Sequence, residues 1–508
     1  MPSTTPLTQD DLTRWRACPR RHWLQRHVAP SESAPPAPCA LINGFDPHFT
    51  DRAPTDQTLR ATFPEAVCIA PPPDEESWAK AIADTRACLA QGWLAGARQD
   101  DGRAILGACL ESNEGVRVQI DVLAAGEHGL RLFKVRHATV GTDADVDLVA
   151  LWTHVAARCG LRVQSAGLML IDTDFVYPGL GCYAGLYREV ELMPVLGSRP
   201  VAQWLVGVRA SERGPEPPAA ESDACQAPCP FLHHCGIPSR RVEREQATSL
   251  NIVGRELAAT LSEHGHINVM SVALDELPDQ RRRRAVRAVQ QGRCIVEPEA
   301  GALLRALPYP RYTLRMDTIG FAQPIWPGTR PYQIMPFQWT CDAQAAPAQL
   351  KQHAFLATAQ GDPRRAFAQS LIDMLGGSGP IFAYNAGFER NRIKELALAF
   401  DDLAGALHAL DTRIVDLFQL ARAHAYHPDM CGSWSFHSFV RAFAPQSNAD
   451  RFEWRGITEA QEAFALSLQG SLSRDALDSL RQALLAYGQR QTEALRLIVH
   501  LFESSACA

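Results

Sequence analysis

Residues 380–400 read PIFAYNAGFERNRIKELALAF, and this stretch contains the change of pattern that decides the fold class. Its first seven residues, PIFAYNA, are largely apolar, which is typical of a short buried strand. From residue 387 onward apolar side chains recur at helical spacing, so we expect a helix over 387–400. Glu389 lies one turn into that helix, where its carboxylate can face the edge of a sheet. A buried strand followed directly by a helix predicts an α/β domain.

The sequence around this stretch supplies the other elements of the same domain. Strands are predicted at RYTLRMDTI (311–319), PYQIMPFQWTCD (331–342) and RIVDL (413–417), and helices at 362–376 and 474–503. We therefore place an α/β domain at 309–508. Residues 241–308 have a helical pattern and are interpreted as a connector.

The first half of the chain predicts a separate mixed α/β domain over residues 1–240. An amphipathic helix is expected at 8–30, because Thr8 and Asp11 have the spacing of a capping box. Residues 30–75 are rich in Pro and Ala and are predicted to be loop. The remaining predicted elements are helices at 76–97 and 145–158, strands at 103–109, 116–124, 130–136 and 162–171, and a Pro- and Glu-rich linker at 211–224.

Four cysteines form a metal-binding pattern. Cys225, Cys229 and Cys235 lie in ACQAPCPFLHHC with C-x3-C-x5-C spacing, and Cys18 lies in RWRACPRRHWL. Closely spaced thiolates can converge on one soft cation or on an iron–sulfur cluster, and Cys18 is the natural fourth ligand. Four thiolates suit a 4Fe-4S cluster or zinc. Either centre would join the first residues of a domain to its last ones. The other cysteines are scattered and are interpreted as ordinary buried thiols.

Composition adds few constraints. The 508 residues allow two or three domains, and the net charge of −6 gives no overall attraction to nucleic acid. No apolar run of about eighteen residues occurs, and the start MPSTTPLTQDD has no basic-then-apolar leader, so we expect a cytoplasmic protein. Arg281 to Arg284 form a basic block. A solvated helix face is the favoured interpretation of this block, and contact with phosphate is the alternative.

These motifs together resemble two nuclease families. The Cys18 element, the IDVL and LFKVR strands and the later cysteine cluster resemble the iron–sulfur RecB-like (PD-(D/E)xK) nucleases, including the exonucleases of CRISPR adaptation. MDTI, YNAGFERNRIKELA, IVDL, YHPDMCGSWSFHSF and LLAYGQRQT resemble a DnaQ-like exonuclease module. The order is similar to a bacterial family that fuses the two, and the resemblance covers nearly the whole chain. It implies a restriction-endonuclease-like mixed sheet followed by a ribonuclease-H-like α/β domain.

The RecB-like resemblance implies a metal site, but this chain carries only some of the residues that such a site needs. Such a site needs an Asp at the end of one strand and an acid-x-Lys motif on the next, because two carboxylates hold the divalent ion. Asp121 fills the first position, but the second strand carries Lys134-x-Arg136. We therefore expect this site to be inactive, with Lys134 and Arg136 available to phosphate.

The DnaQ-like resemblance implies four carboxylates around two metal ions, and Mg²⁺ or Mn²⁺ would be required if this site were active. Here Arg315 replaces the first acid, Asp317 survives as the second, and Gln491 stands where the final helix should carry an Asp. Glu389 is kept, so Asp317 and Glu389 are the residual catalytic candidates. Arg315 can instead occupy the cation position and pair with either carboxylate, or contact nucleic acid.

Other polar residues near these motifs receive weaker interpretations. Asp416 in IVDL is expected to be structural or accessory. His424, His427 and His437 are either a base or ligand of the site or ordinary histidines, and the second interpretation is favoured.

Three functions remain open from sequence. The favoured hypothesis is a catalytically degenerate nuclease-like protein that binds nucleic acid, DNA rather than RNA, or acts as a subunit beside a helicase or nuclease. The runner-up is an active metal-dependent exonuclease with an altered DnaQ-like site. The third is a structural partner that makes no contact with nucleic acid.

Overall fold

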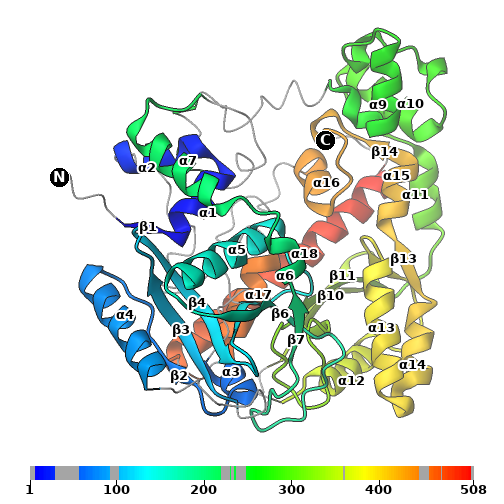
Figure 1. The fold of residues 1–508 in the computed structure, drawn as a ribbon. Coiled ribbons are helices and arrows are strands. Elements are labelled where there is room, and N and C mark those ends of the chain that lie inside the picture. The colour runs from blue at the N-terminus through cyan, green and yellow to red at the C-terminus, as the bar shows by residue number, and fades with distance from the viewer. Residues whose placement is uncertain are drawn as a thin grey trace. The chain divides into compact units, whose positions relative to one another are not determined.

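The computed structural model describes residues 6–28, 56–91, 102–218, 229, 231, 234–235, 248–357, 361–444, 457–468, 470 and 472–504. These residues form two compact units, which are described separately. The first unit contains the described residues up to 235 together with 320–333, and the second contains the rest. Both units combine helices with a mixed sheet (Figure 1), which confirms the α/β fold class.

The first unit is built on a seven-stranded sheet with the order β2-β3-β4-β5-β6-β7, and β1 pairs in parallel with the start of β4. The β2–β3 and β5–β6 pairs are parallel, whereas the β3–β4, β4–β5 and β6–β7 pairs are antiparallel. The strands are β1 (Leu7–Thr8), β2 (Val67–Cys68), β3 (Ala104–Glu111), β4 (Val116–Ala125), β5 (Leu130–Arg136), β6 (Val163–Ile171) and β7 (Tyr187–Glu191).

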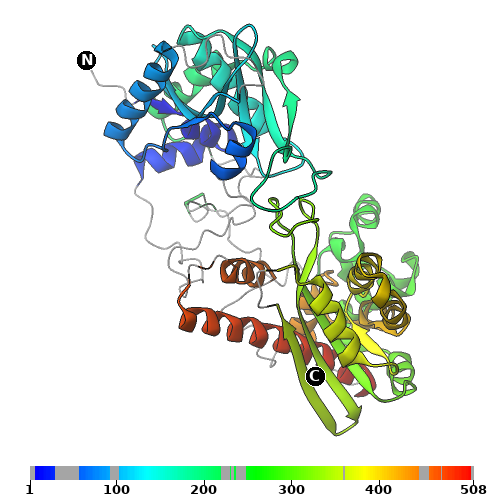
Figure 2. The same ribbon diagram turned by 90° about the horizontal axis from the view of Figure 1, so that it is seen from below.

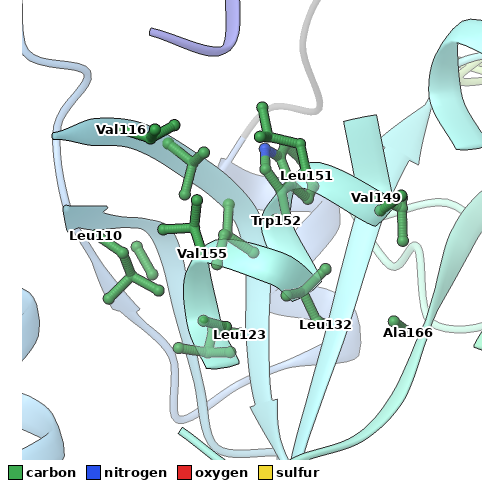
Figure 3. Packing of buried hydrophobic residues seen from close by; sticks show 14 of the residues in the cluster. Leu110, Val116, Leu123, Leu132, Val149, Leu151, Trp152, Val155 and Ala166 are labelled. Atoms are coloured by element: carbon green, nitrogen blue, oxygen red, sulfur yellow. The ribbon is translucent and has the colours of Figure 1, made fainter. Parts of the chain in front are cut away.

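Helix α5 (Asp143–Arg158) covers one face of this sheet. Its Trp152 and Val155 are fully buried in the same hydrophobic cluster as Leu123 and Leu132 of the strands (Figure 3). Removing such side chains from water is the main stabilising term of the unit. The other helices are α1 (Gln9–Ala17), α2 (Pro19–His27), α3 (Asp56–Thr62), α4 (Glu75–Ala90), α6 (Met193–Leu196) and α7 (Val201–Arg213).

The single helix expected over 8–30 is wrong, because α1 and α2 meet at a break. Thr8 and Asp11 do form the predicted capping box. Pro19 has no N–H and disfavours a helical conformation in the residue before it, so Cys18 is extended with φ −161° and ψ 104°. The break places Cys18 at the N-terminus of α2, and Figure 1 shows α1, α2 and α7 side by side.

The segment between the first two strands of the second sheet belongs to the first unit. Residues 320–333 pack there through Thr329, whose carbonyl accepts a hydrogen bond from the Tyr177 N–H at 2.9 Å. Tyr183 donates its hydroxyl to the Pro324 carbonyl at 3.1 Å. Part of this segment was predicted as strand, but the chain turns at Tyr332, which has a left-handed φ of 57°. The strand therefore begins at Met335 instead of residue 331.

The second unit is built on a five-stranded sheet with the order β11-β10-β9-β12-β13. β9, β10 and β11 form an antiparallel meander, and β12 runs parallel to both β9 and β13. β11 was not predicted, because its exposed polar residues do not show the pattern of a buried strand. The strands are β9 (Arg311–Ile319), β10 (Met335–Ala346), β11 (Gln349–Leu356), β12 (Ile381–Ala383) and β13 (Ile414–Asp416).

Helices cover this sheet. α12 (Arg364–Leu375), α13 (Gly387–Ala399) and α14 (Asp401–Asp411) share a buried cluster with β9 and β10, while α18 (Arg474–Ser504) lies alongside the sheet strands (Figure 2). The other helices and strands are η3 (Leu250–Val253), α9 (Arg255–Glu263), η4 (Val269–Ser271), η5 (Leu274–Glu276), α10 (Gln280–Gln291), β8 (Ile295–Val296), α11 (Pro298–Arg305), α15 (Leu417–His424), β14 (Ala425–Tyr426), η6 (Pro428–Met430), α16 (Phe436–Phe443) and α17 (Ile457–Ser467).

A row of hydrogen bonds, the β10–α18 polar seam, fixes the register between strand and helix. Two strand residues advance about 6.6 Å and four helix residues about 6 Å, so alternate residues of β10 can meet successive turns of α18. The bonds run from Gln338 Nε2 to the Leu484 carbonyl (2.9 Å), from Thr340 Oγ1 to the Gly488 carbonyl (2.9 Å) and from Thr492 Oγ1 to Asp342 Oδ1 (3.4 Å).

Within the described ranges, no helix combines the length and the apolar character needed to cross a membrane.

Candidate functional site

A pocket of about 690 Å³ lies in the second unit, between β9, the start of α13 and the start of α16. Arg315 and Glu389 both line it, and Asp317 stands two residues from Arg315 on β9. Much of the remaining lining is aromatic. The aromatic side chains are Tyr384, Phe388, Phe418, Trp434 and Phe436.

The two carboxylates of this site are both deeply buried. Asp317 and Glu389 are each 1% exposed. Burial raises the pKa of Glu389 to about 7, with the Arg315 charge opposing the shift. Burial likewise raises the pKa of Asp317 to about 6, again opposed by Arg315. The structure thus brings together Arg315, Asp317 and Glu389, as the sequence motifs indicated. Burial in this site disfavours the ionised form of both acids.

Arg315 is a cation whose charge acts on both acids of this pair. Its Nε lies 3.8 Å from Asp317 Oδ1, at the long end of an ion pair. In the described part of the chain, that oxygen, the Arg315 Nε and Glu389 Oε2 are buried without a hydrogen-bond partner. Buried polar atoms are normally paired, so this cluster is built to meet a further polar group, such as water, an ion or a ligand.

Gln338 is a site residue that sequence reasoning missed. It is fully buried on β10 and its Nε2 donates to Asp317 Oδ2 at 3.3 Å as well as to the Leu484 carbonyl. A polar residue inside the apolar run of β10 was the available signal. Its second partner is 146 residues away along the chain, so the sequence could not show what it binds.

Asp416 has a structural task. Its Oδ1 accepts hydrogen bonds from the Asn385 N–H at 3.0 Å and from the Phe418 N–H at 2.9 Å, the second of which caps α15. Asn385 has a left-handed φ of 64°, which Asn tolerates better than most residues. This carboxylate therefore holds in place the turn after β12, whose Asn385 lines the pocket.

None of His424, His427 and His437 is among the residues that line the pocket. His427 Nδ1 accepts the Asp429 N–H and helps to begin the η6 turn. In the described ranges, a group with potential metal-ligand atoms within 4.8 Å of one another consists of Glu297, Glu299 and His424. Arg284 already binds Glu297 through two hydrogen bonds of 2.9 and 2.8 Å, which makes that group a poor cation site.

The predicted site of the first unit is closed by an ion pair. Lys134 Nζ lies 2.9 Å from Asp121 Oδ2, and the Val135 N–H donates to the same oxygen at 2.9 Å. Burial raises the pKa of Asp121, although the Lys134 charge opposes this. Arg136 binds both oxygens of Asp145 at 3.0 and 2.8 Å. The two basic residues are therefore engaged with carboxylates of this unit.

Of the four predicted metal-binding cysteines, Cys225 lies outside the described residues. Cys18 and Cys229 are free thiols in this structure, and Cys18 Sγ accepts the Arg21 N–H at 3.4 Å. Glu216 connects the two regions of chain that carry these cysteines. Arg20 Nη2 lies 2.5 Å and His234 Nε2 lies 3.2 Å from Glu216 Oε1. One carboxylate thus contacts a residue two positions from Cys18 and another next to Cys235.

The described molecule is a two-unit α/β protein whose second unit holds a buried carboxylate pair and an arginine at an aromatic pocket. Comparison with protein families adds one assignment. Residues 312–435 match the family model described as "Domain of unknown function (DUF2779)", which spans β9 to the segment before α16 and so contains most of the pocket. No curated protein matches the chain.

Proposed function

We propose that this protein is a catalytically degenerate nuclease-fold protein that binds nucleic acid, DNA rather than RNA, or acts as a subunit of a DNA-processing complex beside a helicase or nuclease. One observation carries the proposal. In each unit a cation of the chain stands beside the carboxylate that would otherwise hold a metal ion, Lys134 beside Asp121 and Arg315 beside Asp317. A fixed cation repels Mg²⁺, and Arg315, whose contact with Asp317 is the longer one at 3.8 Å, can also attract phosphate.

The lining of the pocket supports binding of a single strand. Unpaired bases stack on aromatic side chains, and each stacked base contributes about 1–3 kcal/mol. Phe388, which is 36% exposed, offers such a face at the pocket, and Arg315 offers a charge for the adjoining phosphate. The site therefore combines the two elements of sequence-tolerant single-strand recognition.

The runner-up function is an active exonuclease with an altered DnaQ-like site. The unpaired Asp317 Oδ1 and Glu389 Oε2 favour it, because carboxylate oxygens are the ligands that Mg²⁺ and Mn²⁺ prefer. Such an ion would supply Lewis acidity at a bound phosphate. Arg315 and the raised pKa values of both acids oppose it, since the ligands must be ionised.

Nuclease and binding assays separate these functions. Wild type should leave labelled single- and double-stranded DNA and RNA intact with Mg²⁺ or Mn²⁺, yet bind single-stranded DNA with an affinity that falls as salt rises. Arg315→Ala should weaken this binding about tenfold, because it removes a charge-assisted contact. Cleavage by the wild type that disappears in Glu389→Ala would establish the runner-up. If the wild type showed no cleavage and no binding, the result would favour a purely structural partner.

The cysteines are proposed to hold a 4Fe-4S cluster, with zinc as the alternative. The backbone N–H bonded to Cys18 Sγ and the shared contacts of Glu216 support this, because N–H donors stabilise bound thiolate and Glu216 draws the two cysteine regions together. The proposed role of the metal centre is to stabilise the ends of the first unit.

Metal analysis tests this role. Anaerobically purified protein should contain about four irons per chain with visible absorption. Cys229→Ser should lose the metal and lower the melting temperature of the first unit, whereas Cys182→Ser, at an exposed free thiol, should do neither. A colourless protein with one zinc would exclude the iron–sulfur cluster. A protein with no metal of either kind would exclude both.

A further inference from the structure

The basic block on α10 contains one arginine that the fold does not use internally. Arg282 and Arg283 donate to the backbone carbonyls of Val253 and Leu277, and Arg284 pairs with Glu297. Arg281 makes no such bond in the described part of the chain and is only partly buried. Three arginines of the block thus bond to other parts of the protein, whereas the side chain of Arg281 is not used in this way.

Arg281 has a second cation close to it. Arg284, one turn further along α10, donates to the Arg422 carbonyl at 3.2 Å, so the first turn of α10 lies beside the end of α15. The Arg422 charge, after burial, lowers the pKa of Arg281. Two like charges held together are unfavourable unless an anion neutralises them.

The carboxylates that could neutralise this pair are already occupied. Asp279 accepts from both the backbone N–H and the side chain of Arg282 while it also attracts Arg281, and Glu297 is bound by Arg284. Within the described ranges, neither Arg281 nor Arg422 has a carboxylate at ion-pairing distance. The surface formed by Arg281 and Arg422, the arginine pair, therefore carries net positive charge.

This arginine pair is continuous with the pocket. The Arg422 guanidinium lies 5.4 Å from the ring centroid of Phe418, one turn earlier on α15, and Phe418 lines the pocket. A strand with one base in the pocket can therefore leave it past Phe418 and meet Arg422 and then Arg281. Arg422 at the end of a helix could serve only the helix dipole, but that role does not require Arg281 beside it.

We infer that the arginine pair is a phosphate-binding extension of the pocket, which holds the backbone of single-stranded DNA whose end nucleotide occupies the pocket. This inference rests on the proposed function and names a second surface for it. DNA is kept as the ligand from the proposed function.

The inference predicts an effect that depends on strand length. The Arg281→Ala, Arg422→Ala double variant should bind a long oligothymidylate about tenfold more weakly than wild type at low salt. The slope of log affinity against log salt should fall by about 1.4, which is about 0.7 for each lost phosphate contact. Binding of a thymidine dinucleotide, which reaches only the pocket, should be unchanged. The Arg→Lys double variant should keep most of the affinity.

Matched controls decide between specific and general charge effects. Arg287→Ala removes an exposed arginine from another face of α10 and should leave both oligonucleotides unaffected. Equal affinity of the double variant and wild type for the long strand, or an equal loss in Arg287→Ala, would overturn the inference. Tighter binding of an oligouridylate would overturn the choice of DNA. If wild type bound neither the dinucleotide nor the long strand, the proposed function would fail first.

Discussion

The Glu389→Gln variant should be more stable than the wild type by about 3 kcal/mol above about pH 8, and equal to it below about pH 4. Burial raises the pKa of Glu389 from its ordinary 4.5 to about 7. Between these two values the folded protein keeps this proton while the unfolded chain releases it. The contribution of protonated Glu389 to stability is therefore complete below the pKa of the unfolded chain, and it is lost as the pH rises through about 7. Glutamine does not ionise, and the variant therefore avoids this loss.

Urea unfolding between these pH limits, in EDTA, measures the difference. The free energy of unfolding of the wild type should fall relative to Glu389→Gln across this range. Asp317 shifts in the same direction, so some pH dependence should remain in the variant. Glu395→Gln is the control on the same helix, because its side chain is 52% exposed, and it should follow the wild type. Parallel curves for wild type and Glu389→Gln would contradict the prediction.

The same experiment bears on the two proposed functions. A divalent ion bound to Asp317 and Glu389 would favour their ionised forms and so remove the loss of stability at high pH. Under the degenerate-nuclease proposal, added Mg²⁺ should leave the wild-type curve unchanged, because Arg315 already supplies the local positive charge. A wild-type curve that Mg²⁺ flattens, with no effect on Glu389→Gln, would favour the exonuclease.

The sequence predicted the local part of this architecture well. The change from a strand pattern to a helical pattern in residues 380–400 appears as β12 and α13, and the final helix matches α18 almost to the residue. Arg315, Asp317 and Glu389 could be placed together because their strands and helix follow a recognisable order. Such features depend on periodicities of a few residues, which a sequence shows directly.

Features that depend on distant partners were not predictable. The periodic pattern of residues 8–30 gave no sign that Pro19 divides the helix, although the rule for the residue before proline could have shown it. The return of residues 320–333 to the first unit depends on packing around Tyr177 and Tyr183. The β10–α18 polar seam pairs residues about 150 positions apart, and no local pattern encodes that register.

Gly488→Ala should destabilise the second unit by about 2–3 kcal/mol. A β-carbon at this position would lie 2.4 Å from Gln338 Nε2 and 2.5 Å from Thr340 Cγ2, closer than any normal contact. The strand and helix must then separate, which weakens two hydrogen bonds of the seam at about 1 kcal/mol each and adds packing strain. Alanine regains only about 1 kcal/mol of helix propensity.

Gly405→Ala is the matched control for this change. Gly405 lies on the exposed side of α14 with no atom within 4 Å of the added carbon, so the same substitution should stabilise by up to about 1 kcal/mol. Thermal or urea unfolding should give opposite signs at the two sites, and a stabilising Gly488→Ala would refute the seam. Thr340→Ser keeps the hydroxyl donor and removes the methyl group that the new carbon meets. Combining it with Gly488→Ala should therefore recover part of the loss, because the steric conflict at Cγ2 disappears while the hydrogen bond to the Gly488 carbonyl can re-form.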